Sequence, residues 1–168
     1  KISSLQEARY AYSPKLPGML RNGIADICVK EGEETQSVAD QEKIKALFPN
    51  TYGKKEITFQ KGQNTSEAKK QVVGVILSGG QAPGGHNVIC GLYDALKATN
   101  KENVLYGFKN GPIGLIEDDY VIFDDAYIDQ YRNTGGFDII GSGRTKLETN
   151  EQFAIVAEVC KKHGITAI

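Results

Sequence analysis

The sequence predicts an α/β protein with a parallel sheet and helices on both faces, preceded by an N-terminal extension of different organisation. The run 72–77 (VVGVIL) is continuously apolar and mostly β-branched, as in a strand buried on both faces. From residue 72 onward strand-like and helix-like segments alternate, which is typical of a parallel sheet with crossover helices. Residues 1–70 lack this alternation, so we divide the chain into an extension, 1–70, and a main domain, 71–168.

The extension contains two predicted elements. Residues 38–48 suggest a short helix that Pro49 ends, and residues 56–60 suggest a strand. Disordered arms rarely carry many large apolar residues, so we expect this extension to be ordered. The apolar residues that support this expectation are Leu5, Leu16, Ile24, Ile27, Val29, Leu47 and Phe48.

The main domain is predicted to contain three strands, which are the segments 72–77, 103–108 and 137–140. Each is apolar and short enough for a buried strand. Residues 109–115, which follow the second strand, are predicted to form a loop that leads to a short apolar stretch at 120–123.

Helices are predicted after the first strand, after residue 123 and near the end of the chain. Apolar residues recur at helical spacing from Val88 onward, and residues 124–132 suggest a polar helix. Thr149 and Gln152 have the spacing of a capping box, and Gly164 is placed to end the helix that they begin.

The segment 78–87 (SGGQAPGGHN) is the first candidate site. Its glycines would let backbone N–H groups approach a ligand, and the start of the next helix adds partial positive charge, which together suit a phosphate. It is not a dinucleotide fingerprint, because Gln81 and Ala82 stand where that motif needs glycine, and it lacks the lysine of a Walker A loop. The alternative is a tight turn without a ligand.

The loop 141–146 (GSGRTK) is the second candidate. Ligands of open parallel sheets bind beyond the carboxyl ends of strands, so we expect this loop to meet 78–87 and 109–114 there. Arg144 can contact a phosphate through two N–H groups, and Arg144 and Lys146 could supply the positive charge that 78–87 lacks. The alternative is a solvated loop with ordinary surface cations.

Other polar residues are given structural roles. His86 could touch a phosphate but is equally explained by packing or hydrogen bonding, so we assign it no catalytic role. The acidic residues between 117 and 129 lack the spacing of a calcium loop, and we predict a solvated face and no metal ligand. The three cysteines lack CxxC spacing, which argues against a zinc site: Cys28, Cys90 and Cys160.

Composition excludes two classes of partner. A net charge of −1 over 168 residues provides no basic surface for nucleic acid. No stretch approaches the roughly 18 apolar residues of a membrane span, so we expect a cytoplasmic protein without a membrane partner. The chain starts with Lys1, and residues 164–168 suggest a strand that is just beginning, so we expect the N-terminal portion of a longer protein.

Five motifs occur in order along most of the chain: SVADQ, LFPNTYG, SGGQAPGGHNVI, GFKNGP and NTGGFDIIGSGRTK. Together they resemble the N-terminal region of long-type pyrophosphate-dependent 6-phosphofructokinases. These enzymes use pyrophosphate and Mg²⁺ to phosphorylate fructose 6-phosphate in glycolysis, on a Rossmann-type lobe. The resemblance implies that residues 71–168 are the first part of the domain that binds the phosphoryl donor.

The resemblance also implies roles for individual residues. It places Arg144 at the transferring phosphate as a catalytic residue, and it implies a pyrophosphate site formed by Gly79, Gly80, Gln81, Gly84 and Lys146. Mg²⁺ would bridge the donor oxygens. The catalytic base, the sugar-phosphate site and the metal carboxylate would lie beyond Ile168, so this chain alone is expected to be inactive. The full-length enzyme is expected to be a homo-oligomer, a dimer.

Two alternatives remain open: an ATP-dependent 6-phosphofructokinase and a non-catalytic regulatory subunit of the same family. ATP-dependent members typically read SGGDAPGMN, whereas this chain has Gln81, Gly85 and His86 in that loop. The long extension also resembles the pyrophosphate branch, so we favour pyrophosphate as the donor.

Overall fold

The computed structural model describes residues 2–23, 26–62 and 69–168 of the chain. Its contacts divide the chain into two compact units, one of residues 1–14 with 68–168 and one of residues 15–67. We call them the sheet unit and the hairpin unit and describe each by itself. No helix in the described residues is long and apolar enough to cross a membrane.

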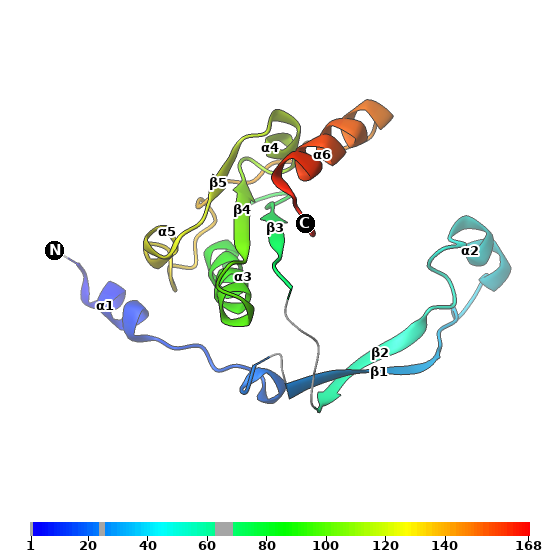
Figure 1. The fold of residues 1–168 in the computed structure, drawn as a ribbon, viewed down its shortest axis with the longest axis horizontal. Helices are drawn as coiled ribbons and strands as arrows, with labels where there is room; N and C mark the ends of the chain where they lie inside the picture. The colour runs from blue at the N-terminus through cyan, green and yellow to red at the C-terminus, as the bar shows by residue number, and fades with distance from the viewer. Residues whose placement is uncertain (1, 24–25, 63–68) are drawn as a thin grey trace. The chain divides into compact units, whose positions relative to one another are not determined.

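The centre of the sheet unit is a three-stranded sheet with the order β3-β4-β5 (Figure 1). Its strands are β3 (Val72–Val75), β4 (Val104–Phe108) and β5 (Tyr120–Ile122). β3 and β4 are parallel, and helix α3 (Gly85–Thr99) connects them. This β-α-β unit confirms the first two predicted strands and the helix after residue 88.

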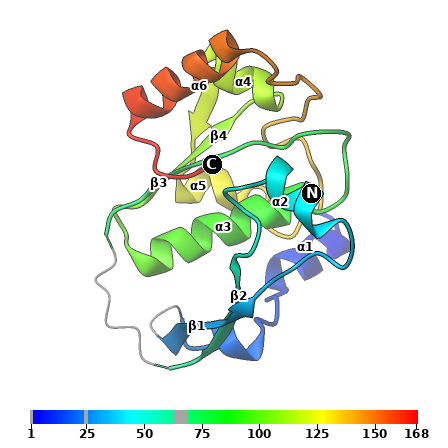
Figure 2. The ribbon, with the colours of Figure 1, turned by 90° about the vertical axis from the view of Figure 1, so that its right-hand side faces the viewer.

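Helices cover both faces of this sheet, as predicted (Figure 2). α3 packs on one face, and α4 (Pro112–Glu117) and α6 (Asn150–His163) pack on the other. A hydrophobic core lies on each face of the sheet, and successive side chains of β4 point to opposite faces. Leu105 belongs to the core on the α3 side, and Phe108 belongs to the core on the α6 side. The chain therefore has the two-sided burial that an α/β layer structure requires.

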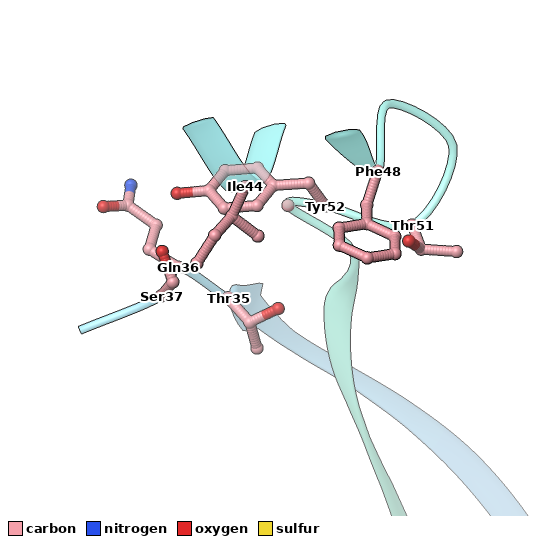
Figure 3. A pocket seen from close by; sticks show the side chains of 8 residues that line it. Thr35, Gln36, Ser37, Ile44, Phe48, Thr51 and Tyr52 are labelled. Atoms are coloured by element: carbon pink, nitrogen blue, oxygen red, sulfur yellow. The ribbon is translucent and has the colours of Figure 1, made fainter. Parts of the chain in front are cut away.

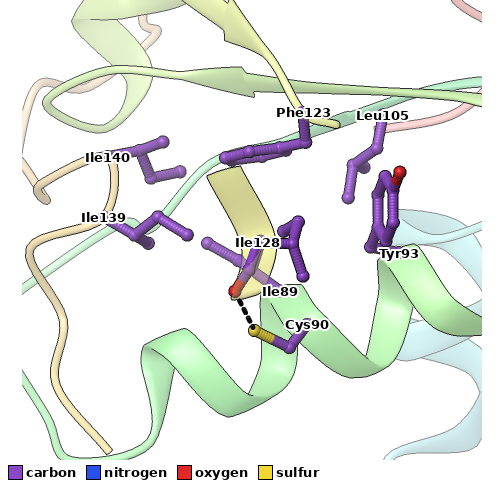
Figure 4. Packing of buried hydrophobic residues seen from close by; sticks show 8 residues of the cluster. All are labelled: Ile89, Cys90, Tyr93, Leu105, Phe123, Ile128, Ile139 and Ile140. Atoms are coloured by element: carbon purple, nitrogen blue, oxygen red, sulfur yellow. Dashed lines mark hydrogen bonds between the residues drawn. The ribbon is translucent and has the colours of Figure 1, made fainter. Parts of the chain in front are cut away.

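The larger core lies between α3 and the sheet (Figure 4). Its fully buried members include Ile89 from α3 and Ile128 from α5 (Asp125–Asp129). The Cys90 thiol donates to the carbonyl oxygen of Ile128 across this core at 3.8 Å, which is drawn in Figure 4. The remaining buried members of the cluster are Cys90, Tyr93, Leu105, Phe123, Ile139 and Ile140.

The predicted strand at 137–140 does not form, and this prediction is wrong. Ile139 and Ile140 are buried, as their apolar character suggested, but the backbone N–H groups of Asp138 and Ile139 donate to the side chain of His86 instead of a neighbouring strand. A buried apolar run needs hydrogen-bond partners for its backbone, and here a side chain provides them.

Two further details of the main domain differ from the prediction. β5 runs antiparallel to β4, so the sheet is mixed. Residues 109–115 are not all loop, because α4 begins at Pro112, the position where the fixed φ of proline suits a helix start.

The end of the main domain agrees with its sequence signals. The side-chain oxygen of Thr149 accepts from the backbone N–H of Gln152, and the capping box predicted for these residues is complete. Gly164 ends α6 with φ +65°, the left-handed conformation that favours glycine. Ala167 then forms a parallel bridge with Val73, so the beginning of a strand is present on the free side of β3.

The hairpin unit contains β1 (Ile27–Glu34), α2 (Gln41–Leu47), β2 (Lys55–Lys61) and the short 3₁₀ helix η1 (Gly18–Leu20). β1 and β2 pair antiparallel. α2 and β2 confirm the helix and strand predicted in the extension, whereas β1 and the N-terminal helix α1 (Ser4–Ala11) were not predicted.

No described residue of the hairpin unit is buried. We expected the extension to be ordered because it carries many large apolar residues; its described residues in this unit form β1, α2 and β2, but none of them is buried. Of the seven apolar residues on which this expectation rested, five are more than half exposed: Leu5, Leu16, Val29, Leu47 and Phe48. Ile24 lies outside the described residues.

Candidate functional site

The candidate site lies where β3 ends, and a main-chain bridge joins its two loops there. Ser78 pairs with Gly143 in a parallel bridge. The N–H of Gly79 donates to the carbonyl oxygen of Gly143 at 2.8 Å, and the N–H of Gly143 donates to that of Leu77 at 3.3 Å. The structure thus brings together the loops 78–87 and 141–146, as the sequence predicted.

A third loop, which follows β4, packs against the second. The backbone N–H of Asn110 donates to the carbonyl oxygen of Ile140 at 2.8 Å. Asn110 and Gly111 both have positive φ, +58° and +78°, and asparagine and glycine tolerate this conformation best. The three loops expected at the carboxyl ends of the strands therefore meet.

The guanidinium group of Arg144 lies over the backbone of Gly80. A Cβ placed on Gly80 would be only 2.9 Å from Nη2 of Arg144, so the guanidinium lies close against this glycine. Arg144 is exposed, and it forms no ion pair or hydrogen bond in the described part of the chain. An arginine that is held against a glycine loop without a carboxylate partner is available to an anion.

The backbone N–H groups of the loop 78–87 are of two kinds. Those of Gly79 and Gly84 already donate within the protein, to Gly143 and Gly135. In the described chain, the N–H groups of Gly80, Gln81 and Ala82 have no acceptor. Of these three donors, that of Gly80 belongs to the residue against which the Arg144 guanidinium lies.

His86 holds the far side of this loop in place. Its side chain is 5% exposed, and its Nε2 accepts from the backbone N–H groups of Asp138 and Ile139, both at 3.1 Å. Nδ1 lies 2.7 Å from the hydroxyl oxygen of Thr134. His86 is thus a buried structural histidine, which is the alternative that the sequence analysis considered beside phosphate contact.

The other two predicted side chains have less support from contacts. Lys146 is exposed, and its Nζ lies 3.6 Å from Oε1 of Glu148, a distance typical of a weak surface pair. The Gln81 side chain is exposed and has no hydrogen bond in the described residues. The roles given to both residues stay predictions.

The acidic residues between 117 and 129 are used in the fold. Asp118 pairs with Lys162 and His163, and hydrogen bonds from Lys162 and His163 hold the pKa of its carboxyl below the ordinary value of 3.8. Asp124 caps α5, and Asp125 accepts from the Tyr93 hydroxyl at 2.8 Å. Within the described ranges, no group of three or more His, Cys, Asp or Glu residues is arranged to hold a metal ion.

Two cysteines are poor candidates for a nucleophile. Burial raises the pKa of the Cys90 and Cys160 thiols, which disfavours the reactive thiolate. Neither Cys90 nor Cys160 forms a disulfide among the described residues.

The hairpin unit has a separate hollow of about 290 Å³ (Figure 3). Ile44 and Phe48 of the α2 region face the polar side chains of Thr35 and Ser37 across it. Its lining belongs mainly to the motifs SVADQ and LFPNTYG and includes no charged side chain. A phosphate group would find no cation there, so the loops of the sheet unit are the better anion site.

Sequence reasoning missed the contribution of Asn110 and Gly111. Their signal was an Asn-Gly pair directly after a strand, which often marks positive φ at both residues. That these two residues contact Gly143 could be recognised only in the three-dimensional structure.

Comparisons with known proteins identify the family of this chain. The family model "Phosphofructokinase" matches residues 72–168. The chain is 50% identical over 166 residues to the pyrophosphate–fructose 6-phosphate 1-phosphotransferase of Porphyromonas gingivalis, which covers 99% of the chain and 30% of that protein. It is 42% identical over 176 residues to the protein of that name from Treponema pallidum, covering 99% of the chain and 31% of the relative.

A third relative of the same name, from Entamoeba histolytica, is 46% identical over 153 residues, which are 91% of the chain and 28% of that protein. The chain thus spans about 30% of the length of these relatives. The matched residues include all three loops of the site.

Proposed function

Because the chain belongs to the phosphofructokinase family, we propose that it carries the phosphoryl-donor site of an enzyme that phosphorylates fructose 6-phosphate with pyrophosphate. The observation that carries this proposal is the Arg144 guanidinium over Gly80, beside backbone N–H groups that have no acceptor in the described chain. Phosphoryl transfer depends on positioning and on stabilising negative charge, and this arrangement supplies a cation without a carboxylate partner and backbone donors for both.

Within this proposal each predicted residue has a defined part. Arg144 would stabilise the charge that develops on the transferred phosphoryl group, and Gly80 and Gln81 would donate their N–H groups to the pyrophosphate. The N–H groups of Gly79 and Gly84 are already used, so these residues would act through their positive φ, +104° and +98°, which shapes the loop. Lys146 would add positive potential from a greater distance.

We propose Mg²⁺ as the cofactor on the basis of the resemblance, since a divalent cation neutralises phosphate charge in such reactions. The described residues do not offer a set of ligands that fits it. No step of the reaction is therefore assigned to the metal here, and its protein ligand is proposed to lie in sequence that the relatives contain beyond this match. A cytoplasmic homo-oligomer remains a prediction of the same kind.

Pyrophosphate is preferred to ATP as the donor because the three relatives carry pyrophosphate in their names. The test mixes the full-length protein, Mg²⁺ and fructose 6-phosphate with each donor in turn and measures fructose 1,6-bisphosphate. We expect turnover with pyrophosphate and a much lower kcat/KM with ATP. An equal or higher kcat/KM with ATP would overturn the donor assignment, and no product with either donor would favour a regulatory subunit.

Arg144 and Gly79 test the site itself. Arg144→Lys should lower kcat more than it raises KM, because a point charge cannot reproduce the two-donor geometry of arginine. Gly79→Val should weaken donor binding, since valine cannot adopt the φ of +104° without strain. Unchanged kcat and KM in both variants would remove this loop from the donor site.

The 168-residue chain alone is proposed to have no phosphotransferase activity. From the resemblance we expect the base, the sugar-phosphate site and the metal carboxylate to lie after Ile168. Measurable turnover by this chain would show that these parts were located wrongly.

A further inference from the structure

The backbones of two loops touch immediately before Arg144. A Cβ placed on Gly111 would lie 2.6 Å from the backbone nitrogen of Gly143, and a Cβ on Gly143 would collide with the carbonyl oxygen of Asn110. Real Cβ atoms essentially never come within 3.0 Å of such neighbours. There is thus no room for a side chain at either glycine unless the two loops separate.

The contact is held in register by hydrogen bonds on both sides. The N–H of Asn110 donates to the carbonyl oxygen of Ile140, and the carbonyl oxygen of Gly143 accepts from the N–H of Gly79. The backbone that leads to Arg144 is therefore fixed between β3 on one side and the loop after β4 on the other. We call Asn110, Gly111 and Gly143 the glycine clamp.

Arg144 depends on this backbone because its side chain has no partner in the described residues. The place and direction of its Cα–Cβ bond set which positions the guanidinium of such an arginine can reach through its staggered rotamers. We propose that the glycine clamp positions Arg144, so that its guanidinium stays over Gly80 with its donors directed at the phosphoryl group. This inference rests on the proposed function and adds to it residues that act through Arg144.

If the glycine clamp only stabilised the fold, its loss would have a different effect from the loss of a positioning role. Its loss would lower stability, and it would affect kcat equally whether Arg144 were present or not. A positioning role predicts that the loss of the clamp matters only while Arg144 is there to be positioned. A double-mutant cycle separates the two.

The test prepares Gly143→Ala, Arg144→Ala and the double variant in the full-length protein and measures kcat and KM with pyrophosphate, Mg²⁺ and fructose 6-phosphate. We expect Gly143→Ala to lower kcat by about 10- to 100-fold with a smaller change in KM, because a displacement near 1 Å can cost about 10²-fold in rate. In the Arg144→Ala background, Gly143→Ala should lower kcat by less than about twofold. Gly91→Ala, in α3 and with open space around the added Cβ, is the control and should leave kcat unchanged.

Gly111→Ala gives a second clamp variant from the other loop, because its added Cβ would lie 2.6 Å from the backbone nitrogen of Gly143. It replaces Gly143→Ala in the cycle if that variant does not fold. An unchanged kcat in the clamp variant, or a loss that multiplies fully with that of Arg144→Ala, would overturn the positioning role. Failure of the proposed function would appear separately, as absence of turnover by the wild-type protein with pyrophosphate.

Discussion

The sheet unit and the hairpin unit both carry large apolar residues, but only the sheet unit buries them. In the sheet unit Phe108 is fully buried between β4 and α6. In the hairpin unit Val29 and Phe59 stand opposite each other on β1 and β2, and each is 60% exposed. Apolar residues are buried only where a second layer faces them, and a two-stranded hairpin alone does not provide one.

The largest effect is expected from a comparison of two phenylalanines, one in each unit. Phe108→Ala should lower the free energy of unfolding of the 168-residue chain by about 3–5 kcal/mol, because it leaves a cavity in a closed core. Phe59→Ala should change it by less than about 1 kcal/mol, since the ring is mostly in solvent. Denaturant titration of both variants measures the difference, and a cost for Phe59→Ala near that of Phe108→Ala would show that the hairpin face is covered.

A second test compares polar side chains. His86→Ala should cost about 1–3 kcal/mol of stability, because the N–H groups of Asp138 and Ile139 lose their buried acceptor. Thr35 of the hairpin unit donates to the carbonyl oxygen of Lys54 at 2.6 Å, but this contact is exposed, so Thr35→Val should cost no more than about 0.5 kcal/mol. A similar loss of stability in the two variants would contradict the difference in burial between the two units.

Helix caps offer a smaller comparison. Thr149→Ala removes the acceptor for the Gln152 N–H at the start of α6 and should cost about 1 kcal/mol. Asp40 precedes α2 without a capping hydrogen bond, and its pair with Lys43 is exposed. Asp40→Asn should therefore change stability by less than about 0.5 kcal/mol. Thermal unfolding of both variants would show whether Thr149 stabilises the protein and Asp40 does not.

The smallest expected effect is the pH dependence of Asp118. Hydrogen bonds from Lys162 and His163 hold its pKa below 3.8 in the folded protein, so its stabilising contribution is complete above pH 3.8 and is lost as the pH falls through the folded pKa. The stability difference between wild type and Asp118→Asn should shrink on acidification below pH 3.8. A difference that stays constant across that range would show that the pKa of Asp118 is not shifted.

The predictions that succeeded rested on local signals. The capping box of Thr149 and Gln152 and the left-handed Gly164 are local devices, and both are confirmed. The strand predicted at 137–140 does not form because the backbone N–H groups of Asp138 and Ile139 donate to the side chain of His86, 52 and 53 positions earlier, and not to a neighbouring strand. No local pattern carries that information. The antiparallel direction of β5 likewise depends on the turn made by α4.

The candidate site was partly predictable for the same reason. Glycine loops after strands indicated which segments would meet, and the structure brings those segments together. Which N–H groups remain available could not be predicted, because the bonds that occupy Gly79 and Gly84 come from Gly143 and Gly135. The contact of Arg144 with Gly80 is also long-range, although both residues stood in the predicted motifs.

The unoccupied donors of Gly80, Gln81 and Ala82 belong to the main chain, and this has a consequence for how the site tolerates sequence change. Most side-chain replacements at Gln81 or Ala82 keep the N–H in place, so evolution could vary these positions while recognition persists. Proline is the one residue that deletes the donor itself. A substitution survey of residues 81 and 82 in the full-length protein should therefore show broad tolerance of side chains and selective loss with proline.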